Sequence, residues 1–297
     1  MRRPAAVTTT TGTVTAGTGP LPSTGATSAP APFFAHRAAG RGPGLAVFLN
    51  AGDPPLPVLR DLVLMLDKEG VDCLELAVPF PDSVTDGPVV RRSARRAMDH
   101  GGVGLDDVLA FLAGVRPQLT RTRIALLADW RYSLGHRDLA AVTRDIAAAG
   151  ADGLLIHALP PRLCETHRES AAAAGLPIVT TCYAESPPKT QAEAAAHASA
   201  YLYLVAHYGR SGTAPAAGHA ALAQTVTGLR AHSRSPIAVG FGVSTRQDVE
   251  AVGASGADAA IIGSAAVAAV ERAQEAGLDV TEAFRDFVRS VLPVPPH

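Results

Sequence analysis

Short apolar runs alternate with longer alanine-rich segments from Gly44 onward, and loops rich in glycine, proline and aspartate separate them. This alternation is typical of an α/β fold in which helices connect parallel strands. The eight candidate strands are Leu45–Leu49, Cys73–Val78, Ile124–Leu127, Gly153–Ile156, Pro177–Thr180, Tyr201–Val205, Ile237–Val239 and Ala259–Ile262. Leu56–Lys68 and Leu139–Ala148 are the clearest helices between them. Eight such units in about 250 residues favour a closed (β/α)8 barrel of the TIM type over an open doubly wound sheet.

Residues 1–43 differ in composition from the rest of the chain, because they are rich in threonine, alanine, glycine and proline and contain no acidic residue. They also show neither helical nor strand periodicity. We therefore predict a disordered tail over 1–43 and a barrel domain over 44–297. Arg2-Arg3 could begin an export signal, but the continuous apolar segment that a signal peptide needs does not follow. A transit peptide is the weaker alternative.

The composition limits the classes of partner. The 297 residues are 47% hydrophobic, and the 26 basic and 27 acidic residues nearly cancel. Without a dense basic run, neither a nucleic acid nor an anionic membrane is an expected partner. The most apolar tract, Ala257–Val270, is too short to span a bilayer. The three cysteines lack metal-binding spacing, so we expect reduced thiols in a cytoplasmic protein, with neither a metal nor a cofactor.

A carboxylate lies within the second candidate strand. Glu75 stands between Leu74 and Leu76, in a run that reads as a strand buried on both faces. Burial disfavours a charged carboxylate, so such a group is either hydrogen-bonded or poised to exchange protons. Asp82 and Asp86 follow in the next loop, at the strand end that carries the chemistry in parallel barrels. The alternative is that both aspartates are turn or helix-cap residues.

Two glycine-containing loops follow the last two candidate strands. Gly240–Thr245 and Gly263–Ala265 each precede a predicted helix, whose first N–H groups could bind a phosphate. Glycine allows an anion to approach the backbone closely. Gly209–Gly212, after the sixth candidate strand, could complete such a phosphate site. The alternative is that these glycines only terminate strands.

Taken together, these residues resemble the α subunit of tryptophan synthase over roughly Gly44 to Val270. Phe48–Pro54 and Leu74–Pro88 match the family's first and second strand motifs in order and spacing, and Gly240–Ser244 and Gly263-Ser264 match its phosphate loops. The resemblance implies a carbon–carbon lyase that cleaves indole-3-glycerol phosphate to indole and glyceraldehyde 3-phosphate by a retro-aldol reaction. It also implies a possible partner, a PLP-dependent β subunit, contacted near Asp82.

The resemblance further implies roles for individual residues. Glu75 falls on the family's catalytic glutamate and Asp86 on the aspartate that holds the indole N–H. Phe48, Tyr203, Ser211, Gly212, Gly242, Gly263 and Ser264 fall on substrate-binding positions. The chemistry agrees with these roles. A buried Glu75 with a raised pKa can protonate C3 of the indole and take the proton of the side-chain hydroxyl, while an ionised Asp86 stabilises the charge on the ring nitrogen.

Three loops depart from the family pattern. Ala128–Tyr132, which includes Asp129-Trp130-Arg131, replaces a segment with tyrosine and asparagine, His157–Pro160 replaces an Asp-x-Pro, and Ala206–Gly212 alters a Ser-Arg-Ser-Gly motif. His157 and His207 could be new catalytic or phosphate-contacting groups, although a lone histidine is more often structural. Three functions therefore stay open: this lyase, either as a subunit or as a stand-alone enzyme, a lyase for another phosphorylated aromatic substrate, and a weakly catalytic subunit that activates a β-type partner.

Overall fold

The computed structural model describes residues 33–34, 42–206, 216–240 and 242–293. Within them lie eight strands: β1 Gly44–Asn50, β2 Cys73–Ala77, β3 Arg123–Asp129, β4 Gly153–His157, β5 Val179–Tyr183, β6 Tyr201–Val205, β7 Ile237–Gly240 and β8 Ala259–Ile262. The helices are α2 Leu56–Glu69, α3 Pro88–Asp99, α4 Leu105–Val115, α5 Leu139–Ala148, α6 Cys164–Ala174, α7 Pro188–His197, α8 Ala216–Arg230, α9 Arg246–Ala254, α10 Ser264–Glu275 and α11 Val280–Val291. Short helical turns cover Arg116–Gln118, Trp130–Leu134 and Pro161–Leu163.

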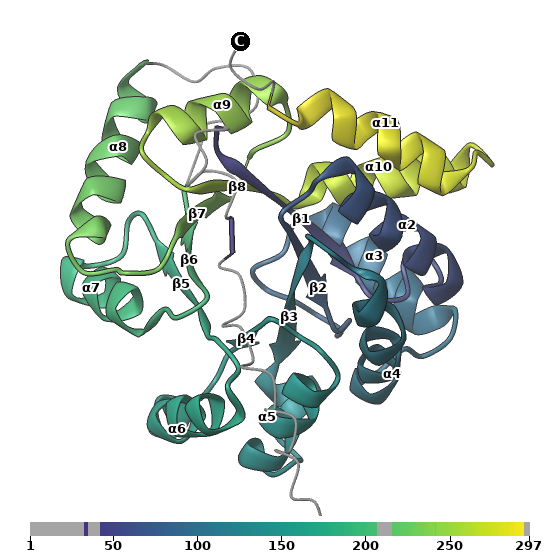
Figure 1. Cartoon of the computed structure of the whole chain (residues 1–297), viewed down its shortest axis with the longest axis horizontal. Coiled ribbons are helices and arrows are strands. Elements are labelled where there is room, and N and C mark those ends of the chain that lie inside the picture. The colour runs from purple at the N-terminus through teal and green to yellow at the C-terminus, as the bar shows by residue number, and fades with distance from the viewer. Residues whose placement is uncertain (1–32, 35–41, 207–215, 241, 294–297) are drawn as a thin grey trace, which may run out of the picture. The chain divides into compact units, whose positions relative to one another are not determined.

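The strands form one parallel sheet in the order β4-β3-β2-β1-β8-β7-β6-β5. The outermost strands, β4 and β5, meet through a parallel bridge between Leu154 and Ile178, and the Leu154 N–H donates to the Pro177 carbonyl at 2.9 Å. This bridge closes the sheet into a barrel, with the helices outside the ring of strands (Figure 1). The predicted (β/α)8 fold is confirmed.

The ends of several helices follow local sequence signals. The Asp138 side chain accepts a 2.8 Å hydrogen bond from the Ala141 N–H and so caps the start of α5. α2 ends at Gly70, which has φ 83° and donates to carbonyls of the last turn. Both helices match their predicted bounds to within one residue.

Five strands, β1, β3, β4, β5 and β7, extend beyond their predicted ends, and β5 also begins later than expected. β3 and β4 continue to Asp129 and His157, which places both residues on strands rather than in loops. β5 begins at Val179, because Pro177 has no N–H to donate and Ile178 makes only the isolated bridge.

Strand side chains alternate between two hydrophobic clusters. One cluster lies between the sheet and the helices and includes Leu49, Leu74 and Leu126. The other fills the barrel interior and contains Ala46, Cys73, Ala125, Leu155, Val179, Tyr201, Ala238, Ala259 and Ile261, together with Phe33 and Phe34. The barrel interior is therefore a packed core, and the polar groups described below lie from its middle toward the end at which the strands finish.

Phe33 and Phe34 close the end of the barrel at which the strands begin. They are only 6% and 4% exposed, and each ring lies 5.3 Å from the ring of Tyr201, the first residue of β6. A Cβ on Gly44 would lie 2.7 Å from Phe34, so a side chain there would collide with this ring. Both phenylalanines belong to the predicted tail. The tail boundary at residue 43 stays a prediction, but these two residues contribute to the core.

None of the helices in the described part of the chain has the length and apolar character needed to cross a membrane.

Candidate active site

Glu75 lies inside the barrel at the middle of β2. It is 1% exposed, and the Tyr201 hydroxyl donates a 2.6 Å hydrogen bond to its Oε1 atom. Burial raises the pKa of Glu75 to about 7, and the Tyr201 hydrogen bond opposes this rise only in part. The raised pKa and its cause, desolvation by burial, agree with the sequence analysis. Leu74 and Leu76 belong to the outer cluster, so it is the barrel interior that removes water from this carboxyl.

Phe48 and Tyr203 share this interior with Glu75. Phe48 is the register partner of Glu75 on the neighbouring strand β1, and Tyr203 follows Tyr201 by two residues on β6. Burial raises the pKa of Tyr203, and the negative charges of Glu75 and Asp86 raise it further. Both carboxylates therefore lie within electrostatic range of the Tyr203 phenol. These four predicted site residues therefore converge.

Asp86 precedes helix α3 without capping it. The N-cap residue of α3 is Gly87, with Pro88 at the first helical position, and the Asp86 side chain is partly exposed. The helix-cap alternative for Asp86 is therefore wrong for this helix. Asp82 is exposed and has φ 59°, a conformation that aspartate tolerates in turns.

The two predicted phosphate loops differ in the donors that they leave available. Before α9, the Asp248 carboxylate already accepts the Ser244 and Thr245 N–H groups, each at 2.9 Å. The N–H groups of Ser244 and Thr245, directly before α9, and that of Asp248 in its first turn are thus used within the chain, which leaves fewer donors for an anion at this loop. Before α10, Gly263 is the N-cap and no side chain caps the helix. The loop after β8 is the better anion site of the two.

Gly263 has room for an approaching anion. A Cβ on Gly263 would meet only Phe48, at 3.9 Å, so this glycine borders the interior space beside Phe48. Ser264 is the first residue of α10, and Gly242 has φ 79°, which favours glycine. Ser211, Gly212 and His207 lie outside the described residues.

Asp129 and His157 face each other across β3 and β4, an arrangement that the sequence analysis did not predict. They are register partners at the ends of these strands, and His157 Nδ1 lies 3.1 Å from Asp129 Oδ2. Phe80 stacks on the His157 ring and on Tyr132, with centroid distances of 6.1 and 5.6 Å. Aligning the C-terminal ends of the third and fourth predicted strands as neighbours in a parallel sheet could have found this contact.

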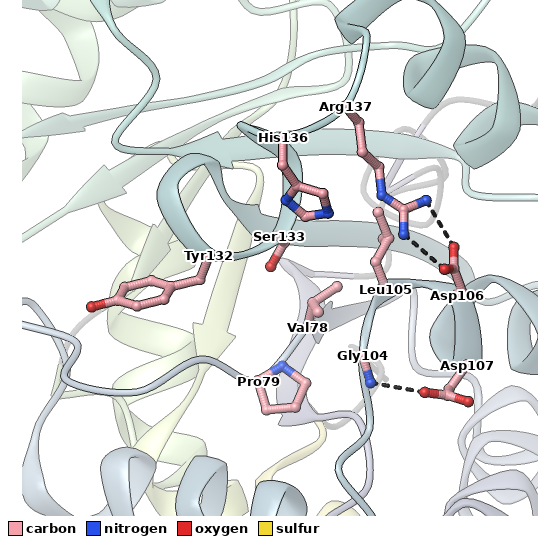
Figure 2. A pocket seen from close by; sticks show the side chains of 10 residues that line it. All are labelled: Val78, Pro79, Gly104, Leu105, Asp106, Asp107, Tyr132, Ser133, His136 and Arg137. Atoms are coloured by element: carbon pink, nitrogen blue, oxygen red, sulfur yellow. Dashed lines mark hydrogen bonds and ion pairs between the residues drawn. The ribbon is translucent and has the colours of Figure 1, made fainter.

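An open pocket of about 260 Å³ lies beside the barrel mouth, between the loops after β2 and β3 and the start of α4. Figure 2 shows Val78, Pro79 and Tyr132 on one part of its wall and the Arg137–Asp106 ion pair on another, with both guanidinium hydrogen bonds at 2.7–2.8 Å. Neither Glu75 nor Asp86 lines this pocket. Among the described residues, no group of three or more His, Cys, Asp or Glu is arranged to hold a metal ion.

A (β/α)8 barrel with a buried carboxyl whose pKa is raised to about 7 has the architecture of an enzyme. The sequence model of the tryptophan synthase alpha chain family matches residues 34–291, and the chain belongs to this family. The alpha chain of Synechococcus elongatus is 36% identical over 247 residues, which are 83% of this chain and 90% of that protein. The alpha chain of Ralstonia nicotianae is 32% identical over 248 residues, 84% and 91% of the two chains.

Solved structures give the same result. The tryptophan synthase subunit alpha from Legionella pneumophila superposes with a TM-score of 0.77 at 28% identity, covering 87% of this chain and 95% of the other. A mutant alpha subunit from Pyrococcus furiosus has a TM-score of 0.75 at 26% identity, covering 84% and 98%. The family match begins at residue 34, so it includes Phe34 of the barrel plug, the pair Phe33 and Phe34 that closes the barrel where the strands begin.

Proposed function

We propose that this chain cleaves indole-3-glycerol phosphate to indole and glyceraldehyde 3-phosphate. The observation that carries the proposal is the buried Glu75 carboxyl, whose pKa of about 7 suits a group that must both give and take a proton near neutral pH. It lies in the barrel interior with Phe48 and Tyr203, in a chain of the tryptophan synthase alpha family.

In the proposed mechanism, protonated Glu75 gives its proton to C3 of the indole. The ring becomes an electron-poor indolenine, and the Asp86 carboxylate stabilises the positive charge on the ring nitrogen. Glu75, now a carboxylate, takes the proton of the adjacent side-chain hydroxyl as the C–C bond breaks. The electrons of the broken C–C bond return to the ring, which leaves as indole. The carbon that carried the hydroxyl becomes the aldehyde carbon of glyceraldehyde 3-phosphate.

The substrate phosphate is assigned to the backbone around Gly242, Gly263 and Ser264, with Ser211 and Gly212 as further ligands. The uncapped start of α10 supports this assignment, because its free N–H groups and the helix dipole both favour an anion. Binding the remote phosphate would hold the reacting carbon over Glu75.

A PLP-dependent β-type subunit is the proposed partner, with Asp82 in the contact. Asp82 is exposed in the loop after β2, and the open pocket beside Val78 and Pro79 adjoins the same loop. The three free cysteines support a cytoplasmic location, where thiols stay reduced.

The test compares the parent chain with Glu75→Gln, in the presence and absence of a β subunit, and measures indole release from indole-3-glycerol phosphate. The amide keeps the shape of the side chain but cannot exchange the proton, so we expect kcat to fall by about 10²–10⁴-fold while substrate binding changes only a few-fold. Glu250→Gln, on the exposed face of α9, is the matched control and should keep the parent rate.

Activity of Glu75→Gln within tenfold of the parent would remove Glu75 from the mechanism. If the parent releases no indole but still activates the β subunit, the protein is a regulatory subunit instead.

A further inference from the structure

The Asp129–His157 pair lies at the barrel mouth, and hydrogen bonds hold its carboxylate and imidazole in place. Asp129 is 4% exposed, its Oδ1 accepts the Tyr132 N–H at 3.0 Å, and its Oδ2 lies 3.1 Å from His157 Nδ1. A carboxylate only accepts hydrogen bonds, so His157 Nδ1 donates to it. The second ring nitrogen, Nε2, is thereby left to bind something else.

Nε2 is poorly satisfied within the chain. Its contact with the Thr85 hydroxyl is 3.5 Å, at the outer limit for a hydrogen bond. The His157 side chain is 37% exposed, so its free edge is reachable from the mouth of the barrel. Ala158, the next residue, has φ 54°, a conformation that is costly for alanine and that collects at functional sites.

The pair lies on the interior faces of its strands. Asp129 shares its face of β3 with Ala125, and His157 shares its face of β4 with Leu155, and both of these apolar residues belong to the interior cluster. The pair thus belongs to the same interior that holds Glu75 on β2, which is one strand from Asp129 and two strands from His157.

The sheet order places this pair across the barrel from the proposed phosphate site. In a closed ring ordered β4-β3-β2-β1-β8-β7-β6-β5, β3 lies opposite β7 and β4 opposite β8. A substrate with its phosphate at the loops after β7 and β8 and its reacting carbon over Glu75 on β2 directs its aromatic ring toward β3 and β4. The stacked rings of Phe80 and Tyr132 supply a flat apolar surface beside His157.

An unsubstituted benzo ring offers no hydrogen-bonding group to this wall. Covering His157 Nε2 with such a ring would remove it from water without a partner, which is costly. A hydroxyl on the ring can donate a hydrogen bond to neutral Nε2 or accept one from the protonated imidazole. It therefore gives His157 a partner in either protonation state.

We propose that Asp129 and His157 form a polar subsite for the aromatic ring, and that the preferred substrate is an indole glycerol phosphate with a hydroxyl on its benzo ring. His157 contacts the hydroxyl, and Asp129 is the positioning residue that fixes the imidazole. This inference rests on the proposed lyase function and names its substrate class.

The test measures kcat/KM of the parent for unsubstituted indole-3-glycerol phosphate and for the four analogues that carry one hydroxyl at a free benzo position. A site built around a hydrogen bond rejects an analogue that lacks it, and because His157 is partly exposed we expect a preference of about tenfold for at least one hydroxylated analogue. His157→Phe keeps a planar ring against Phe80 but removes Nε2, so this preference should disappear, because the rate with the hydroxylated analogue falls more than the rate with the unsubstituted substrate. Asp129→Asn, which keeps the oxygen that caps Tyr132, should reduce the preference in part. His136→Phe, an exposed position in the loop after β3, is the control and should keep it.

The outcomes separate the two proposals. Cleavage of the unsubstituted substrate without preference for any hydroxylated analogue overturns the polar subsite and leaves the lyase function standing. An equal loss of rate with every substrate in His157→Phe also overturns it, and assigns His157 to holding the loop that carries Thr85 and Asp86. If the parent cleaves none of the five compounds, the lyase function fails and the subsite fails with it.

Discussion

The Tyr201 hydroxyl donates a 2.6 Å hydrogen bond to Glu75 Oε1 across the interior of the barrel, between residues 126 positions apart in the sequence. The bond stabilises the carboxylate, whereas burial favours the neutral carboxyl, and burial is the larger effect. Tyr201 also packs against Phe33 and Phe34. One tyrosine therefore connects the barrel plug to the proposed catalytic group.

Tyr201→Phe should raise the pKa of Glu75 further above about 7, because it removes the hydrogen bond that opposes burial. Proton transfer to C3 needs the protonated carboxyl, so activity should persist to higher pH than in the parent. The measurement is the pH profile of kcat for indole release. An alkaline limb at the parent position would show that this hydrogen bond does not set the pKa of the catalytic group.

Glu271 on α10 connects this helix to α3 and should influence acid stability. Its carboxylate accepts hydrogen bonds from Arg92 and Arg96, and Arg96 also pairs with the buried Asp53. The Arg92 hydrogen bond, followed by that of Arg96, lowers the pKa of Glu271 to about 2 from its usual 4.5. A depressed acid pKa contributes stability that is complete above pH 4.5 and is lost as the pH falls toward 2.

Glu271→Gln should therefore lower the free energy of unfolding at pH 7 by about 2 kcal/mol, since Arg92 loses its charged partner and Arg96 keeps only Asp53. The difference from the parent should shrink between pH 4.5 and 2. Denaturant unfolding at several pH values measures both effects, with Glu250→Gln as a surface control. A constant difference across this range would contradict the linkage.

Removing residues 1–40 should destabilise the barrel, because the deletion includes Phe33 and Phe34. The tail composition alone predicts that this truncation is harmless, but each of these rings is buried, and losing a buried phenylalanine side chain typically costs about 3–5 kcal/mol. Removing residues 1–31 keeps both rings and should leave the melting temperature near that of the full chain. Equal melting temperatures for the two truncations would show that the barrel plug contributes little to stability.

Gly263→Val should weaken anion binding without much loss of fold stability. The added side chain has space in the apo protein but occupies the approach to the start of α10. Inorganic phosphate should protect the parent against thermal unfolding, as any ligand of the folded state does, and protect the variant much less. Gly114→Val on α4, where an added Cβ meets nothing within 4 Å, is the control. Equal protection of all three proteins would place the anion elsewhere. Gly242→Val is a poorer probe, because φ 79° strains any side chain there.

The fold could be predicted because its signals are local. Each apolar run forms a strand where it was expected, with ends shifted by at most three residues, and Asp138 and Gly70 mark helix ends that depend only on neighbouring residues. The position of Glu75 in a doubly buried strand was equally readable. The groups that remove water from Glu75 could not be predicted, because alternation turns Leu74 and Leu76 away from it and the barrel interior surrounds it instead.

Other features needed the complete fold. Asp248 occupies the N–H groups that the glycine loop before α9 was expected to offer, a competition that motif spacing does not reveal. Phe33 and Phe34 lie in a segment with tail-like composition, and only the interior of the closed barrel gives them a place to pack.

By itself the sequence determined the eight βα units, their order and a carboxylate in the second strand, because strand and helix periodicity and turn chemistry act over a few residues. Only the tertiary structure decided that Tyr201 meets Glu75 and that Asp129 meets His157. These pairs depend on strand register and on closure of the barrel, which are set by contacts between residues far apart in the chain.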